Sequence, residues 1–232
     1  MKTWIRKSLL TATSMALLGA SSLGSAAPVE AVYGFEVGNP PAFVAALDRL
    51  LATDELKAAK VSLWATEFNG SNPTTHLIVT DHQSHDAYQK MTSTRLATDA
   101  WPRYLLAVND IADLTGETLY IERMREGGNW REHGAVAAYV MSVSDPRRYA
   151  EAFGTMIKEA GHPGSVRLME ARAGATGYSH VVLITAPDIA KLNNYLDKLL
   201  AGDAYAKFVG KVGDIRKITT VSMYSRIKSW GN

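Results

Sequence analysis

Residues 99–111 read DAWPRYLLAVNDI, and residues 203–215 read DAYAKFVGKVGDI. The two stretches lie 104 residues apart, and both open with Asp-Ala, carry aromatic residues at their third and sixth positions, and end with Asp-Ile. At the same offset, His76 matches His180 and Tyr120 matches Tyr224. Near the start of each copy the offset is 106, and it joins Tyr33, Val37, Pro40 and Phe43 to Tyr139, Val143, Pro146 and Tyr149. A period near one hundred residues indicates two copies of a whole domain, because solenoid units are far shorter.

The elements expected within each copy come in the same order. Alternating residues predict an opening strand at 33–37 and 139–143, and Asn39 or Asp145 ahead of a proline predicts the start of a helix. Two strands joined by a turn follow, at 61–68 with 76–80 and at 166–173 with 180–185. A second helical region is expected at 84–112 and 189–216, broken near 98–99 and 202–203, and a last strand at 118–123 and 220–226. The predicted fold class is therefore α+β, with two tandem ferredoxin-like βαββαβ repeats.

This order, with its long second helical region and many aromatic residues, resembles the dimeric α+β barrel group, which includes antibiotic-biosynthesis-type monooxygenases. In that group two ferredoxin-like units pair their sheets into one barrel. Because both units lie on one chain here, the resemblance implies a barrel closed within the chain, and two independent ferredoxin-like domains are the alternative. The expected boundaries are a first repeat at 27–124, a linker at 125–134 and a second repeat at 135–232. The resemblance rests on topology and duplication, since the chain has no catalytic motif of the family to carry over.

Residues 1–26 are predicted to be a cleavable signal peptide. Lys2, Arg6 and Lys7 form a basic start, 9–23 is a short run of apolar and small residues, and cleavage is expected after Ala26. The predicted localisation is therefore periplasmic or secreted.

The charge and the cysteine count narrow the possible partners. The formal charge of +2 falls to −1 when the three basic residues of the signal peptide are removed. A nearly neutral chain lacks the basic field that attracts nucleic acid or anionic membranes, so neither is an expected partner after cleavage. The chain has no cysteine, so disulfide and thiolate chemistry are absent. The expected partner is a small apolar or aromatic molecule, bound by a monomer with pseudo-twofold symmetry or by a homodimer.

Two matched histidines are the candidate catalytic residues. His76 and His180 each begin an apolar strand, and each follows a hydroxyl residue. Two imidazoles related by a pseudo-twofold axis could frame a pocket or act as acid and base near neutral pH. The alternative is structural: a strand-end histidine whose ring bonds a backbone carbonyl would be copied with the domain.

Two pairs of tyrosines join these histidines as candidate ligand-binding residues. Tyr33 matches Tyr139 on the first strands, and Tyr120 matches Tyr224 on the last strands. Each could present an apolar ring and a polar tip to a ligand cavity. They could equally be β-favouring residues on a half-buried sheet, because parity within a strand does not show which face points into a barrel.

No metal site or cofactor is expected. The best metal-like cluster is 81–86, where His82 and His85 are spaced to share a helix face beside carboxylates. The second copy has no matching residues, and a polar helix N-terminus explains the cluster. The phosphate-loop, dinucleotide-binding, serine-hydrolase and zinc-protease motifs are also absent from the sequence.

These observations favour an exported protein of the α+β barrel type that binds a small molecule. The resemblance implies an alternative, a cofactor-independent monooxygenase or isomerase acting on an aromatic or apolar small molecule. In that case His76 or His180 would act as base, while Tyr33 or Tyr139 would orient the substrate. A structural or assembly protein is the second alternative.

Overall fold

The computed structural model describes residues 27–231, and the predicted signal peptide lies outside the described residues. The first half of the chain contains seven elements: β1 (Val29–Val37), α1 (Pro40–Leu51), β2 (Val61–Phe68), β3 (His76–His82), α2 (His85–Ala97), α3 (Ala100–Val108) and β4 (Ala112–Gly127). The second half has the same order: β5 (Ala135–Val143), α4 (Pro146–Ala160), β6 (Ser165–Ala173), β7 (His180–Ala186), α5 (Ile189–Leu200), α6 (Asp203–Val212) and β8 (Arg216–Trp230). A 3-10 turn, η1 (Trp130–Glu132), joins the halves.

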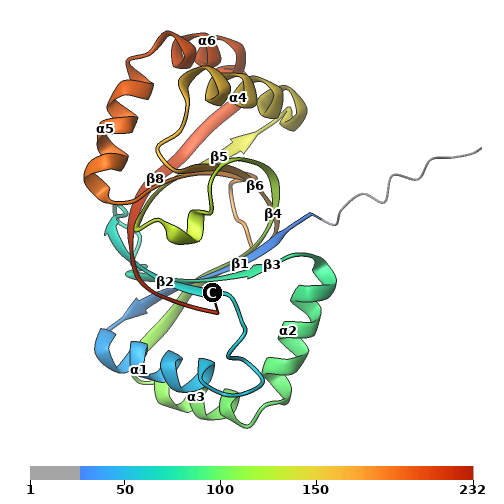
Figure 1. Cartoon of the computed structure of the whole chain (residues 1–232), viewed down its shortest axis with the longest axis vertical. Helices are drawn as coiled ribbons and strands as arrows, with labels where there is room; N and C mark the ends of the chain where they lie inside the picture. The colour runs from blue at the N-terminus through green and yellow to red at the C-terminus, as the bar shows by residue number, and fades with distance from the viewer. Residues whose placement is uncertain (1–26, 232) are drawn as a thin grey trace, which may run out of the picture.

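The eight strands form one closed antiparallel barrel in the order β1-β3-β2-β8-β5-β7-β6-β4 (Figure 1). Each half contributes four adjacent strands, and the halves meet where β2 pairs with β8 and where β4 pairs with β6. The mixed α+β class and the barrel are therefore as predicted, and the barrel closes within the chain. Two independent domains, the alternative, are not what the described residues form.

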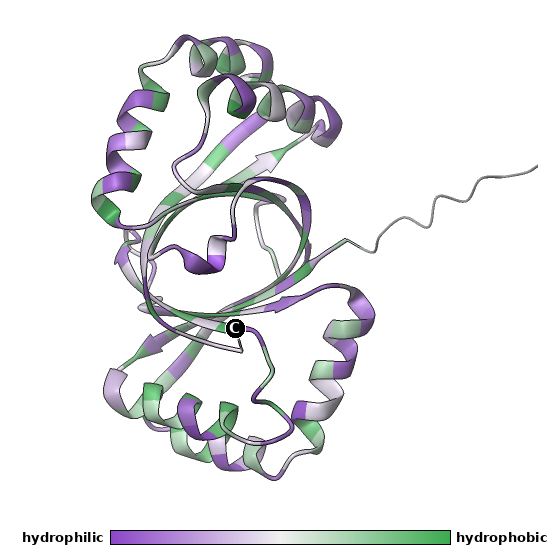
Figure 2. Ribbon diagram, in the orientation of Figure 1, coloured by the Kyte–Doolittle hydropathy of each residue, from purple (hydrophilic) through white to green (hydrophobic). Residues whose placement is uncertain are grey.

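Helices cover two opposite sides of the barrel, with α1, α2 and α3 on one side and α4, α5 and α6 on the other (Figure 1). Green and purple residues alternate along these helices in Figure 2, as expected for helices with one face on a core. The two helix layers pack separate cores against the outer face of the barrel, one around Phe43 and Leu47 and the other around Phe153 and Ile157. Within the described residues, no helix is long and apolar enough to cross a membrane.

The predicted helix starts are confirmed by their capping contacts. The side-chain oxygen of Asn39 accepts a hydrogen bond from the amide of Ala42 at 3.2 Å, and Asp145 accepts one from the amide of Arg148 at 3.0 Å. In both helices proline follows the cap, where its missing N–H costs no helical hydrogen bond.

The last strand of each half is longer than its pattern predicts. β4 begins at Ala112 and β8 at Arg216, at the positions where the helical regions were expected to end. Each long strand pairs with its own half and with the other half. In β4, residues 112–121 pair with β1 and residues 119–127 pair with β6. The early part of β4 is mostly exposed and polar, so it lacks the apolar alternation that predicts a strand.

Candidate functional site

A cavity of about 670 Å³ lies inside the barrel, between the two halves. One end is lined by Trp130 of η1, which lies within the ring of strands in Figure 1. The other end is lined by residues of the turns 69–74 and 174–178, by residues 115–118 of β4 and by residues 219–220 of β8. The volume falls in the range of small-molecule sites in proteins, which is roughly 300–1,000 Å³.

Strand alternation decides which side chains enter this cavity. On β1 the even-numbered residues Glu30 and Val32 line it, whereas Tyr33 and Phe35 pack against the helix-side core. Since β-strand side chains point to opposite faces in turn, the same division holds around the barrel. The resulting middle wall is apolar and includes Val32, Leu77, Val79, Val136, Ala138 and Val181.

Tyrosine hydroxyls give the cavity a polar side. The hydroxyls of Tyr120 and Tyr178 lie 2.8 Å apart, and Thr118 Oγ1 lies 2.9 Å from the Tyr178 hydroxyl. Tyr224 lines the cavity as well. Burial raises the pKa of Tyr120 and Tyr224, so both phenols are neutral near pH 7. These hydroxyls can both donate and accept hydrogen bonds to a ligand.

A buried ion pair lies at the η1 end of the cavity. Arg167 of β6 donates from Nη1 to Glu30 Oε2 of β1 at 2.6 Å, and the two side chains are only 3% and 4% exposed. The guanidinium carbon of Arg167 lies 4.2 Å from the centre of the Trp130 ring, a cation–π contact. Arg167 and Glu30 are therefore the charged groups that a ligand meets at this end.

The environment of Glu30 changes its acidity. Burial raises the pKa of Glu30 from 4.5 to about 7, and the Arg167 guanidinium opposes this shift. Asp81 and Glu122 add negative charge nearby, which raises the pKa further. Glu30 can consequently take up or release a proton near neutral pH, as a general acid or base must.

The two matched histidines lie outside the cavity. His76 has its ring 6.2 Å from that of Phe43 in the helix-side core, and His180 lies on the same face of β7 as the core residues Val182 and Ile184. Each ring Nδ1 is hydrogen-bonded to the preceding hydroxyl, at 2.8 Å from Thr75 and at 2.9 Å from Ser179. Burial lowers the pKa of both histidines, so the neutral imidazole is favoured. Their arrangement matches the structural alternative, although the bonding partner is a hydroxyl and not a backbone carbonyl.

The tyrosine pairs divide between the two faces of the barrel wall. Tyr120 and Tyr224 line the cavity, while Tyr33 and Tyr139 pack against the helix-side cores. The structure thus places two of the six candidate ligand-binding residues in the cavity and four outside it. A ligand-binding role for Tyr120 and Tyr224 stays a prediction.

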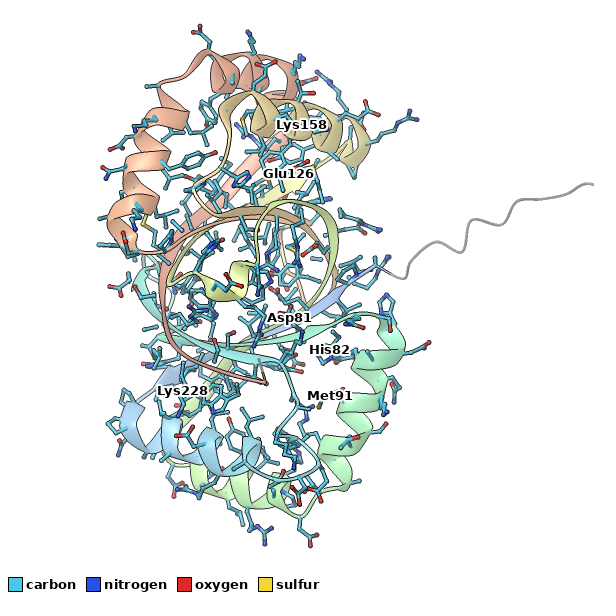
Figure 3. All side chains as sticks on the ribbon, viewed as in Figure 1. Asp81, His82, Met91, Glu126, Lys158 and Lys228 are labelled. Atoms are coloured by element: carbon cyan, nitrogen blue, oxygen red, sulfur yellow. The ribbon has the colours of Figure 1, made fainter. Side chains whose placement is uncertain are left out.

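The metal-like cluster does not converge, and among residues 27–231 no three histidine or acidic side chains are grouped to hold a metal ion. Asp81 and His82 lie on different sides of β3 (Figure 3), with Asp81 3.4 Å from Arg131 and the His82 ring 5.2 Å from Tyr88 of α2. Burial and the nearby Arg95 lower the pKa of His82 to about 4. The described residues that line the barrel cavity include no histidine, so the cavity offers no imidazole to a metal or a haem iron.

Sequence reasoning missed Glu30 and Arg167, the residues that define the charged end. A signal was present, because each is a single charge within an apolar run, Val29–Val32 and Val166–Met169. The two charges are opposite, and a buried charge needs a partner. That β1 and β6 are the two neighbours of β4 in the closed barrel could not be seen from either run alone.

Comparisons with known proteins agree with the fold. No protein-family model matches the chain, and no curated protein matches it. A proposed monooxygenase from Fusobacterium nucleatum has a similar structure, with a TM-score of 0.61 and 16% identity over 88% of this chain and 94% of the other. A proposed monooxygenase from Lactobacillus acidophilus matches with a TM-score of 0.58 and 9% identity, over 88% and 96% of the two chains.

An anthrone oxidase-like protein has the same fold, with a TM-score of 0.56 and 11% identity over 87% of this chain and 92% of the other. Sequence identities this low show a shared fold and carry no information on activity. The chain is thus similar in architecture to monooxygenase-like α+β barrel proteins.

Proposed function

We propose that this protein binds a small, largely apolar or aromatic molecule inside its barrel. The observation that carries the proposal is the cavity of about 670 Å³, whose apolar wall is combined with tyrosine hydroxyls and one charged end. Apolar walls with a few placed polar groups are the usual composition of small-molecule sites. The fold of the compared structures is consistent with this proposal.

Filling the cavity tests this proposal. Ala138 is buried in the cavity wall, so Ala138→Phe should occupy the space and weaken binding of the neutral probe 2-naphthamide at least tenfold, measured by its fluorescence. The melting temperature should stay the same or rise if the phenyl ring fits the space. Ala206→Phe, on the exposed surface of α6, is the matched control and should bind like the original protein. Equal binding by both variants would exclude the cavity as the site.

An enzymatic function is the second candidate, favoured by the compared structures named as monooxygenases and as anthrone oxidase-like. Glu30 would remove a proton from the substrate, and the Tyr120 and Tyr178 hydroxyls would hold the substrate oxygen. With anthrone, the carbanion left by proton removal would pass electrons to O₂, giving anthraquinone and water. Anthrone-dependent oxygen uptake should then fall at least about a hundredfold in Glu30→Gln, in keeping with the effect of losing a general base. Uptake at the uncatalysed rate by the original protein would exclude this activity on anthrone.

We also propose that the protein is exported and loses residues 1–26. The basic start, the short apolar run and the lack of cysteine support this. The protein isolated from its host's periplasm or medium should begin at Ala27. Protein found only in the cytosol with an intact first segment would contradict export.

A further inference from the structure

At the charged end of the cavity, Arg167 has a hydrogen-bond donor that is not used by the described residues. Arg167 has a short contact to Glu30 and a longer one, 3.7 Å, to Glu122. Its Nε is buried and has no hydrogen-bond partner among the described residues. A buried N–H of a charged group without a partner is costly, and arginine offers five donors in a planar fork. This side chain is among those that line the cavity, and only 3% of its surface is exposed, so a ligand reaches it by competing for the contacts that cover it.

The neighbouring charges are matched in separate pairs. Glu122 receives two hydrogen bonds from Arg125, at 2.8 and 2.7 Å. Asp81 lies 3.4 Å from Arg131 of η1. Glu30 is therefore the acceptor that holds Arg167, and it is also the group that an anionic ligand would compete with.

We propose that Arg167 binds the carboxylate head group of an apolar or aromatic acid, and that Glu30 takes up one proton when the acid binds. This inference rests on the proposed small-molecule function and names the ligand class for the same cavity. The apolar body of the acid lies along the wall formed by Val32, Val79 and Ala138, and the head group lies against Trp130 and Arg167.

The proton is needed because of the local charge. Two carboxylates that share one arginine repel each other, with Glu122 and Asp81 nearby on the adjoining strands. Protonated Glu30 removes one charge and donates a hydrogen bond to the ligand carboxylate. The pKa of about 7 means that this proton is available near neutral pH. Tyr120, a further titratable group near Glu30, is neutral in this range because burial raises its pKa.

The test compares 2-naphthoate with 2-naphthamide, which share a ring system and differ in head-group charge. At about pH 6 the original protein should bind the acid at least tenfold more tightly than the amide. Arg167→Met should lose this preference and keep its affinity for the amide within about threefold. If Arg167→Met does not fold, the double variant Glu30→Gln/Arg167→Met removes both charges of the buried pair and should also show no preference.

The pH dependence gives a second readout. Above pH 7, affinity of the original protein for the acid should fall about tenfold per pH unit, because binding requires a proton that free Glu30 has lost. Glu30→Gln should bind the acid with nearly constant affinity from about pH 6 to pH 9. A decline that persists in Glu30→Gln would assign the proton to another group, such as Asp81, and overturn this part of the proposal.

The outcomes separate this inference from the proposed function. If acid and amide bind equally and Ala138→Phe weakens both, the cavity binds small molecules and the carboxylate inference is wrong. If neither probe binds the original protein at millimolar concentration, the small-molecule function itself fails. A preference for the acid that remains after Arg167 is replaced would also overturn the inference.

Discussion

Glu30 and Arg167 form a pair that the protein keeps at an energetic cost. Both side chains are almost fully removed from water, and the hydrogen bond between them is short. Desolvation of two charges is offset by their attraction only in part, so a buried pair is weak evidence of a purely stabilising role. Their position at the end of a cavity is where the proposed ligand would use them.

The pair should show strong coupling in a double-mutant cycle. Arg167→Met should lower the free energy of unfolding by about 3–5 kcal/mol, because it leaves a buried carboxylate unpaired. Adding Glu30→Gln should restore part of this loss, measured by urea denaturation near pH 8. Arg123→Met is the matched control, since Arg123 and Glu170 form a 2.6 Å pair on β4 and β6 that is partly exposed. An exposed pair contributes about 0–1 kcal/mol, so a similar cost for both arginines would contradict the argument.

The sequence predicted some of the residue types of the site. It did not predict which side chains point into the barrel. Tyr120 and Tyr224 were expected at a ligand site and lie in the cavity, whereas Tyr33 and Tyr139 are on the helix side. All four fit a half-buried strand equally well, because both faces of this barrel wall are covered. Only the closure of the sheet shows which face is the interior.

At the scale of elements, helix α2 differs from its counterpart α5. None of the residues of α2 is buried, whereas α5 buries Leu192, Leu196 and Leu199. Met91 of α2 is partly buried against the core of the first half, and it is labelled on the helix in Figure 3. A helix with little buried apolar surface opens locally at low free-energy cost.

Hydrogen exchange should therefore be faster in α2 than in α5. In peptide-resolved mass spectrometry, residues 85–97 should exchange before residues 189–200, with α4 protected throughout. The comparison is internal, so solution conditions and global stability are the same for both helices. Equal protection of α2 and α5 would show that the contacts of Met91 and its neighbours hold α2 more firmly than its burial indicates.

Prediction of elements succeeded where local chemistry decides the structure. Asn39 and Asp145 ahead of proline mark helix starts because capping is a contact between near neighbours. The prediction of elements was incomplete for β4 and β8, because the first residues of both strands are exposed and are held by hydrogen bonds to β1 and β5. Pairing partners distant in the sequence leave no local periodicity.

At the scale of the whole molecule, the two halves complete one barrel, so each half covers apolar surface of the other. The cavity wall combines Val32 and Val79 of the first half with Ala138 and Val181 of the second. Neither half alone can cover this apolar surface. Closure also pairs both edges of each four-stranded unit, so no strand edge is left free within residues 27–231.

Unfolding in urea should consequently be a single transition. Tryptophan fluorescence, to which Trp64 and Trp130 of the barrel interior contribute along with Trp101 and Trp230, should give the same midpoint as far-ultraviolet circular dichroism. As a check on shared structure, Ala138→Phe should move both curves together. Two separate transitions would show that the halves are independently stable.

The pairing of β2 with β8 joins residues 61–68 to residues 223–230. During synthesis, β2 emerges long before β8 does. The apolar inner face of the first half stays exposed until β8 has emerged. Contacts of such long sequence separation slow folding and leave intermediates open to aggregation. The same seam that completes the cavity therefore makes assembly of the barrel depend on the last strand.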